Sequence, residues 1–515
     1  MPLFGRIAVA ALAGVAAGLS FEPHNLVYLL PVAVAALTLT CLGATPRLGF
    51  LVGTVFGVAF MLFLLPWLQV IGTDAWIALS ILQGLFYGLL GLGTVAVTRL
   101  PWWPLWAASL WVGVELLRGS VPFGGFPWGR LAYATVDTPV APLFAYAGAA
   151  GATLAVALVG TVLAWAATRV RRTPARALAG VVAVCLVASI GSVFPLNSAS
   201  PDADRASVTI AAVQGNVPGE GMDAFAERRV VLDNHVAATK ELADRVDAGE
   251  IAQPDIVIWP ESSTDIDPFE DPTAFADIQD AVDAVGVPTL VGAMVDGPEP
   301  DEVLNQGIVW EPAAGPGERY SKTHPVPFGE YIPFRDLLAK LFTRLDQIPR
   351  DMRPGTEPGV LTMNGTTIGD VICFEVAYDD LVREVVKGGA ELVVVQTNNA
   401  TYMGTGQIEQ QFAIARLRAI ETNRPVVVAA TNGVSGIVNP QGGVVERAPT
   451  RAQHVLVESV LLPGGTTTGV RFGKWVEGLL AVAAAIAVSS GIGLGYRRRR
   501  PPKQREPAVA TIGEA

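Results

Sequence analysis

Eight long apolar stretches constrain this chain more than any other feature of its sequence. A helix that crosses the hydrocarbon core of a bilayer needs about 20 mostly apolar residues. Such stretches occur seven times before residue 200 and once near the C-terminus. We predict membrane-spanning helices at about 5–20, 26–43, 48–70, 76–98, 103–118, 142–168, 177–197 and 475–496. The first resembles a signal peptide, but further spans follow at once, so we interpret it as an uncleaved helix.

The composition agrees with a membrane protein that also carries a polar domain. The 515 residues are 51% hydrophobic and 16% charged, and their mean hydropathy is +0.42. The net charge of −11 comes mainly from a polar block in the middle of the chain, which has no basic tract, so we expect no nucleic-acid partner. The three cysteines and four histidines show neither a disulfide framework nor metal-ligand spacing. We therefore expect no metal and no cofactor.

Arginine residues predict the orientation of the spans, because cytoplasmic loops are enriched in Lys and Arg. With the N-terminus inside, the cytoplasmic loops carry Arg47, Arg99 and the arginines at 169–176, and the tail carries 497–500. Arg118 and Arg130 fall on the outer side, against the rule. This topology places the polar block outside the cytoplasm. The predicted units are a transmembrane domain at 1–200, an extracytoplasmic domain at 206–462, a last transmembrane helix at 475–496 and a cytoplasmic tail at 497–515.

Two ionisable residues at the end of one span allow two interpretations. Glu115 and Arg118 precede a loop rich in Gly, Pro and aromatic residues that contains Trp128. Ionisable groups at membrane depth are often functional. Alternatively, the two residues form an ion pair at the membrane interface, and Trp128 is an aromatic belt residue. The sequence favours neither interpretation.

The polar block alternates strand-like and helix-like segments. Short β-branched runs are typical of strands. They occur at 206–216, 255–261, 287–295, 367–375, 391–399 and 424–433, and a helical pattern occurs at 407–423. This alternation predicts an α/β sandwich whose helices cover the sheets. Glu261, Cys373 and the pair Asn398–Asn399 come at the ends of predicted strands, where α/β proteins gather functional groups.

Cys373, in "DVICFEVAYDD", is either a buried packing residue or a nucleophile. A free thiol has a pKa of about 8.5, so a nucleophilic cysteine needs a base or a nearby cation. No histidine has a convincing position for this role, although His324 is the best of the four. The remaining candidates are the carboxylate of Glu261 and the ammonium of Lys322.

These residues, in this order, carry a family resemblance. Glu261 in "IWPESS", Lys322 in "YSKTHPVPFGEYIP" and Cys373 in "GDVICFE" resemble the Glu-Lys-Cys triad of the nitrilase superfamily of carbon–nitrogen hydrolases. That resemblance covers roughly 206–462 and implies an αββα sandwich. The eight-span frame, "GGFPWGRLAY" and "VQGN" make the whole chain similar to the bacterial apolipoprotein N-acyltransferase family.

The resemblance implies roles for individual residues. Glu261 would be the general base, Cys373 the nucleophile, and Lys322 a stabiliser of the oxyanion. The backbone N–H of Phe374 would be a second oxyanion donor, and Glu330 and Glu375 match two further family glutamates. Asn398 and Trp128 are candidates for substrate binding. The chain departs from the family pattern at 217–225 and 398–411, which lie on the substrate side.

The resemblance also implies partners and a location. The acyl donor would be a phospholipid, and the acceptor a diacylglyceryl-apolipoprotein. The enzyme would cross the bacterial plasma membrane several times, with its catalytic domain on the extracytoplasmic side. Two alternatives are a membrane-anchored amidase that hydrolyses small amides, and a transporter or receptor with an inactive outer domain. The number of spans argues against the first, and the intact triad against the second.

The segment 334–345 has one apolar helical face. Its members are Phe334, Leu337, Leu338, Leu341, Phe342 and Leu345. A helix of this kind can lie in a membrane interface, and its position directly after "FGEYIP" favours a lid over the site. The alternative is a helix packed on the core of its own domain.

Overall fold

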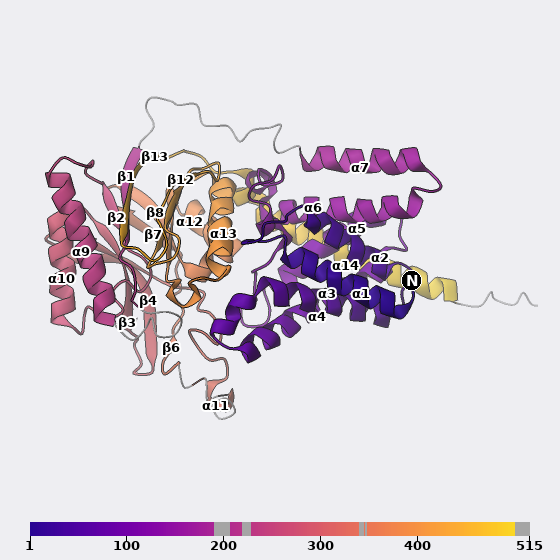
Figure 1. Ribbon diagram of the computed structural model, residues 1–515, viewed down its shortest axis with the longest axis horizontal. Coiled ribbons are helices and arrows are strands. Elements are labelled where there is room, and N and C mark those ends of the chain that lie inside the picture. Colours follow the sequence, from indigo (N-terminus) through magenta and orange to yellow (C-terminus); the bar gives the residue numbers. More distant parts are fainter. Residues whose placement is uncertain (190–206, 219–227, 339–344, 346–347, 500–515) are drawn as a thin grey trace, which may run out of the picture.

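The computed structural model describes residues 1–189, 207–218, 228–338, 345 and 348–499. Helices gather at one end of the molecule and an α/β sandwich at the other (Figure 1). The helices of the first part, which we call the helical frame, are α1 (Leu3–Gly18), α2 (Leu29–Cys41), α3 (Pro46–Leu64), η1 (Pro66–Val70), α4 (Thr73–Val97), α5 (Trp103–Arg118), η2 (Leu131–Ala134), α6 (Leu143–Arg169), α7 (Pro174–Ala188) and α14 (Thr468–Arg499).

A helix lies at each of the eight predicted spans. By length and composition alone, α3, α4, α6 and α14 are able to cross a membrane, whereas α1, α2 and α7 are shorter apolar helices. Pro66 follows the end of α3 and opens η1, because proline is tolerated in a first helical turn but not in a helix interior. The predicted span at 48–70 is therefore two elements.

Glycines allow the two helices α3 and α4 to pack backbone against backbone. A Cβ added to Gly57 would lie 2.6 Å from the Cβ of Tyr87, and one added to Gly53 would collide with the Tyr87 carbonyl. Small residues at such crossings are the usual means of close helix packing in membranes.

The sandwich contains two sheets that face each other. The first has the strand order β13-β1-β2-β3-β4-β5, with β6 paired to β4, and the second has the order β12-β11-β10-β9-β8-β7. The strands of the first sheet are β1 (Ser207–Gln214), β2 (Ile256–Ile258), β3 (Thr289–Asp296), β4 (Glu302–Glu311), β5 (Gly315–Ser321), β6 (Asp351–Met352) and β13 (His454–Leu461). Those of the second are β7 (Gly359–Met363), β8 (Thr366–Ile372), β9 (Leu392–Thr397), β10 (Val426–Ala430), β11 (Gly436–Val438) and β12 (Val444–Arg447).

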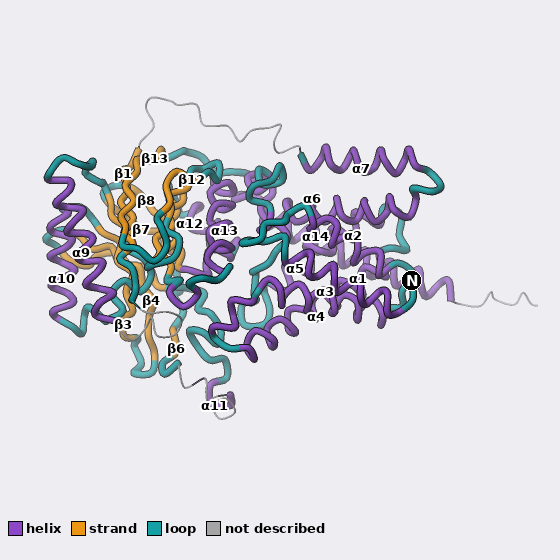
Figure 2. The backbone as a smooth tube through the Cα atoms, in the orientation of Figure 1, coloured by secondary structure: helices purple, strands orange, loops and turns teal. Residues whose placement is uncertain are grey.

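All six predicted strands are present, as β1, β2, β3, β8, β9 and β10, and the predicted helix at 407–423 is α13 (Gln407–Thr422). Helices α9 (Arg228–Asp247) and α10 (Pro272–Val285) cover the outer face of the first sheet (Figure 2). Helices α12 (Asp379–Lys387) and α13 lie between the second sheet and the helical frame (Figure 1). The layers are therefore helix, sheet, sheet, helix, as an α/β sandwich requires.

The apolar core of the frame continues into the sandwich. Leu381 of α12 and Phe412 of α13 belong to the same buried cluster as Trp111 of α5 and Phe144 of α6. A separate cluster fills the space between the two sheets, and a third lies under α9 and α10. The helices that cover the second sheet are thus shared with the frame.

Candidate active site

Four predicted site residues lie at the ends of strands. Glu261 follows β2, Lys322 follows β5, Cys373 follows β8 and Asn398 follows β9. β2 and β5 belong to one sheet, and β8 and β9 to the other. The site is therefore built where the two sheets of the sandwich meet.

Lys322 lies between two carboxylates. Its Nζ is 3.2 Å from Oε1 of Glu261 and 2.5 Å from Oε1 of Glu330, and the lysine is fully buried. Burial alone would lower the pKa of Lys322, but Glu261 and Glu330 outweigh burial and raise this pKa well above its usual value. The ammonium is therefore a permanent positive charge. Glu330 also accepts a hydrogen bond from the Val326 N–H at 2.8 Å.

Glu261 is held by neutral donors as well as by the lysine. Its Oε1 accepts from Nδ2 of Asn305 at 2.7 Å, and its Oε2 accepts from the backbone N–H of Asn398 at 2.8 Å. Sequence reasoning missed Asn305. The available signal was a polar side chain in "EVLNQGIVW", a run that otherwise resembles an apolar strand.

Cys373 occupies a strained turn directly after β8. Its φ of +59° lies in the left-handed region, which costs a residue with a Cβ about 1 to 3 kcal/mol and is concentrated at functional sites. Burial raises the pKa of its thiol to about 12; Glu261 adds to this rise and Lys322 opposes it. The thiol is therefore protonated at neutral pH and needs a base before it can attack. A thiol, a carboxylate and a buried ammonium together are suited to covalent chemistry at a carbonyl group.

Glu375 connects the cysteine turn to the lysine segment. The carboxylate is fully buried. Its Oε1 accepts from the backbone N–H groups of Thr323 and His324 at 2.8 and 2.9 Å, and its Oε2 accepts from the Ile372 N–H at 2.7 Å. The Tyr320 hydroxyl donates to the same carboxylate at 2.9 Å. Glu375 thus fixes the residues next to Lys322 against the residue before Cys373.

Phe374, whose N–H was the predicted oxyanion donor, places its side chain against the frame. Its ring stacks on Trp128 at 5.2 Å and on Phe126 at 5.6 Å between ring centroids. Trp128 is 1% exposed, and its Nε1 donates to Oε1 of Gln410 at 2.7 Å. The interpretation of Trp128 as an aromatic belt residue is therefore wrong, because the ring is enclosed between α13 and the cysteine turn.

The interpretation of Glu115 and Arg118 as an interfacial ion pair is also wrong. Glu115 lies 3.4 Å from Nε of Arg130 and accepts from Thr153 at 2.7 Å. Arg118 is fully buried and donates instead to the carbonyls of Phe126 and Trp128 at 2.8 and 2.7 Å. Arg118 thereby fixes the loop that carries Trp128.

The predicted lid is only partly described. Helix α11 (Arg335–Leu338) is the described part, and Leu341 and Phe342 lie outside the described residues, as does the side chain of Leu338. Phe334 is 71% exposed, and its ring is 6.0 Å from that of Phe123 in the frame loop.

Among the groups that the structure describes, no cluster of three or more His, Cys, Asp or Glu residues suits a metal ion.

Two family models match this chain. Residues 13–162 match the apolipoprotein N-acyltransferase N-terminal domain, and residues 209–466 match the carbon-nitrogen hydrolase domain. The apolipoprotein N-acyltransferase of Mycolicibacterium smegmatis is 39% identical over 97% of this chain and 87% of its own length. The chain belongs to the apolipoprotein N-acyltransferase family.

More distant members of the apolipoprotein N-acyltransferase family also align along most of the chain. The one from Photobacterium profundum is 26% identical, over 92% of each chain. Among solved structures, an amidase from Nesterenkonia sp. aligns with 49% of this chain and 90% of its own, at 16% identity and a TM-score of 0.34. The carbon-nitrogen hydrolase match includes all four strand-end residues, and the N-terminal match includes Trp128 and its loop.

Proposed function

We propose that this chain transfers the sn-1 acyl chain of a phospholipid to the α-amino group of an N-terminal diacylglyceryl-cysteine. Membership of the apolipoprotein N-acyltransferase family supports this activity. The observation that carries it is the position of Cys373: a thiol beside the Glu261–Lys322 pair, on a turn whose next residue packs on the helical frame. An enzyme that takes both substrates from a membrane needs its nucleophile at such a junction.

In the first half-reaction, Glu261 takes the proton of the Cys373 thiol, and the sulfur attacks the carbonyl carbon of the sn-1 ester. Lys322 and the Phe374 N–H stabilise the negative oxygen that forms. The carbon–oxygen bond then breaks, and the leaving oxygen receives the proton from Glu261. The products are a thioester on Cys373 and a lysophospholipid.

In the second half-reaction, the acceptor amine attacks the thioester carbonyl. Glu261 takes a proton from the amine and returns it to the sulfur as the carbon–sulfur bond breaks. The product is an amide on the lipoprotein, and Cys373 is a thiol again. Glu330, 2.5 Å from Lys322, would hold the ammonium in place during both steps.

We also propose that all eight long helices of the frame cross the plasma membrane, and that the sandwich lies on the extracytoplasmic side. The N-terminus, the α6–α7 connection with its arginines and the end of α14 lie at the end of the frame that faces away from the sandwich (Figure 1). This supports a cytoplasmic position for the arginine-rich loops.

The test is purified protein in detergent or liposomes with a phospholipid and a diacylglyceryl-cysteine peptide. Mass spectrometry should show the peptide gaining one acyl chain and the phospholipid losing its sn-1 chain. Two parallel reactions omit the peptide: one contains small amides in its place, and the other contains only water as the acceptor. Release of ammonia from amides without peptide acylation would instead identify a membrane-anchored amidase.

A further inference from the structure

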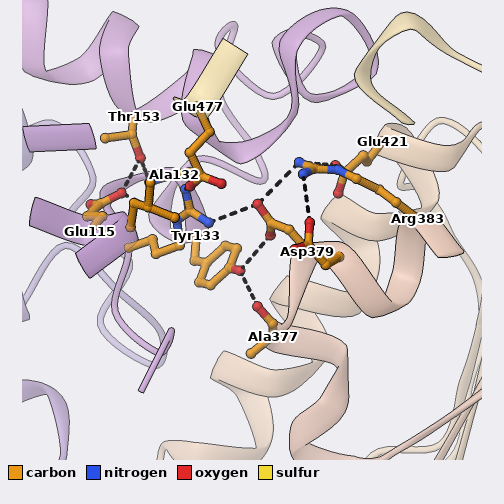
Figure 3. Close-up of polar contacts among 12 residues, drawn as sticks. Glu115, Ala132, Tyr133, Thr153, Ala377, Asp379, Arg383, Glu421 and Glu477 are labelled. Carbon is orange, nitrogen blue, oxygen red and sulfur yellow. Dashed lines mark hydrogen bonds and ion pairs between the residues drawn. The ribbon is translucent and has the colours of Figure 1, made fainter. Parts of the chain in front are cut away.

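Buried charged and phenolic side chains meet where the frame joins the sandwich (Figure 3). Each is at most 7% exposed. They are Glu115, Arg130, Tyr133 and Glu477 from the frame, and Asp379, Arg383, Arg418 and Glu421 from α12 and α13. We call this set the junction cluster. The mechanism proposed above uses none of them.

Asp379 lies at the centre of the junction cluster. Its Oδ2 accepts from Arg130 at 2.8 Å and from Arg383 at 3.2 Å, and its Oδ1 accepts from Arg418 at 2.7 Å. Burial alone would raise the pKa of Asp379, but the three arginines outweigh burial and hold this pKa well below its usual value. Asp379 is therefore an anion that frame and sandwich share.

The cluster also holds the backbone of the cysteine turn. The Tyr133 hydroxyl donates to the Ala377 carbonyl at 2.7 Å (Figure 3). Arg418 donates to the carbonyls of Val376 and Ala377 at 2.8 and 3.1 Å. Val376 and Ala377 close the short helix η5 (Cys373–Ala377), which begins at the cysteine itself. A hydroxyl of the frame thus binds the turn four residues after Cys373.

Arg130 ties this arrangement to the frame. Besides Asp379, it contacts Glu115 of α5 at 3.4 Å and Glu477 of α14 at 2.6 Å. Glu115 is itself fixed by the Leu131 N–H at 2.7 Å. A series of polar contacts therefore connects two frame helices, through Arg130 and Asp379, to the segment after the cysteine.

Two glycines make room for the guanidinium of Arg383. A Cβ on Gly473 of α14 would lie 2.8 Å from it, and a Cβ on Gly148, at the kink of α6, would collide with it. Arg383 Nε donates to Glu421 at 2.9 Å. The frame helices are thus shaped to receive a charged side chain of α12.

A buried ion network is a poor source of stability, because desolvation of the charges offsets their attraction, and apolar side chains of similar volume often stabilise as well or better. Directional hydrogen bonds are what an apolar junction cannot supply. We propose that Tyr133 and Arg130 are positioning residues, through which the helical frame sets the geometry of the Cys373 turn. This rests on the proposed function only in taking Cys373 as the nucleophile.

The first test removes one atom, the hydroxyl oxygen of Tyr133. Tyr133→Phe keeps the buried ring and the bonds from Arg418 to the Val376 and Ala377 carbonyls. It removes the hydroxyl that donates to the Ala377 carbonyl and accepts from Arg418 at 2.9 Å. Its matched control is Tyr87→Phe, since the buried Tyr87 hydroxyl of α4 has no hydrogen-bond partner among the described residues. With phospholipid and no acceptor, intact-mass spectrometry should show thioester formation slowed about tenfold or more in Tyr133→Phe and unchanged in Tyr87→Phe. Melting temperatures of both variants should match wild type.

A second readout needs no lipid. In a Cys185→Ala background, the pH dependence of Cys373 alkylation by iodoacetamide reports the geometry and environment of the thiol. Tyr133→Phe and Arg130→Lys should both change this profile, because lysine keeps the charge of Arg130 but cannot bridge three carboxylates. If both variants show the wild-type alkylation profile and the wild-type rate of thioester formation, the proposal is overturned. A lower melting temperature with an unchanged rate of thioester formation per folded molecule would also overturn it. Wild-type protein that is alkylated at Cys373 but never acylated by phospholipid would contradict the proposed function and leave the alkylation profiles to decide this inference.

Discussion

The Nζ of Lys322 lies 3.2 Å from Oε1 of Glu261, and both side chains are at least nine-tenths buried. Lys322 is a buried cation that holds the Glu261 carboxylate in place through this contact. The same cation is available to an oxyanion that forms on a substrate carbonyl. In the proposed mechanism, this one contact joins the base to the electrostatic stabiliser.

Cys373→Ala should abolish both thioester formation and peptide acylation. The covalent path requires the sulfur, whereas alanine can replace a small thiol at a modest cost in packing. Cys373→Ser should be nearly inactive, because a hydroxyl is much harder to deprotonate than a thiol. Intact mass after incubation with phospholipid measures the adduct, and Cys185→Ala is the matched control. Wild-type turnover in Cys373→Ala would assign the chemistry to another residue.

Glu261→Gln should block thioester formation over the neutral pH range. The thiol pKa is raised to about 12, so almost no thiolate exists near pH 7 without a base. Glutamine keeps the shape of Glu261 but cannot take a proton. In the variant, the adduct rate should therefore rise with pH as the fraction of thiolate rises, whereas the wild-type rate should depend less on pH. A pH profile that is parallel to wild type would show that Glu261 is not the base.

Lys322→Arg should retain little activity, since a planar guanidinium does not replace a compact ammonium.

Glu375→Gln should lower both stability and rate. The carboxylate accepts from the Tyr320 and Thr323 hydroxyls and from the backbone N–H groups of Thr323, His324 and Ile372, whereas the NH₂ of glutamine cannot accept. Each buried donor left without a partner costs about 1 to 3 kcal/mol, so the melting temperature should fall clearly. Glu318→Gln is the control, because Glu318 lies on the neighbouring β5 and its bond to the Thr362 N–H is exposed. Equal melting temperatures for the two variants would show that the bonds of Glu375 do not hold the cysteine turn against the lysine segment.

Asp370 should make the protein less stable as the pH rises. Burial, together with Glu375 and Glu261, raises the pKa of this fully buried carboxyl well above its usual value. Below about pH 4, folded and unfolded chains are both protonated, so the group has no effect. Above that, only the unfolded chain releases the proton, and the folded state loses up to about 1.4 kcal/mol for each pH unit.

Asp370→Asn removes this titration. The stability of the variant relative to wild type should therefore be greater at about pH 8 than at about pH 5. Thermal unfolding at the two pH values measures the difference, with Asp255→Asn as a control, since Asp255 is only partly buried and already bonds the Thr209 N–H at 2.7 Å. A pH-independent difference for Asp370→Asn would show that the native carboxyl is ionised.

Sequence patterns were most informative where local physics decides the outcome. Apolar runs predicted the eight frame helices, and β-branched runs ending in polar residues predicted β2, β8 and β9 with Glu261, Cys373 and Asn398 at their ends. The strands β4 and β5 were not predicted, because polar residues interrupt the apolar run of β4 and predominate in β5. Consequently Asn305 and Tyr320, which position Glu261 and Glu375, were missed as well.

Partners that come from distant parts of the chain could not be predicted. Glu115 and Arg118 are neighbours on one helix face, which favours an ion pair, yet each finds a better partner in the loop that follows. Asp379 is an ordinary helix-start acid in sequence, but besides Arg383 of its own helix it meets two arginines from other segments, Arg130 and Arg418. Desolvation explains why the observed partners differ from the expected ones. A buried charge is costly unless it is paired, so it binds whichever partners the fold brings close, even from distant parts of the chain.

Phe334 is an exposed aromatic residue beside the frame. Its ring is 71% exposed and forms an aromatic group with Phe123, at 6.0 Å, which in turn contacts Phe328 at 6.1 Å. Phe123 comes from the frame loop and Phe328 from the segment of Glu330, so these rings border both the frame and the active site. If they guide acyl chains, Phe334→Ser should slow thioester formation from a long-chain phospholipid but not from a soluble short-chain ester. An exposed ring contributes little to the core, so the melting temperature should stay unchanged. Val445→Ser, at an exposed position of β12, controls for the loss of an apolar surface residue. If Phe334 instead packs in the core, its removal should cost about 3 to 5 kcal/mol and slow both esters equally.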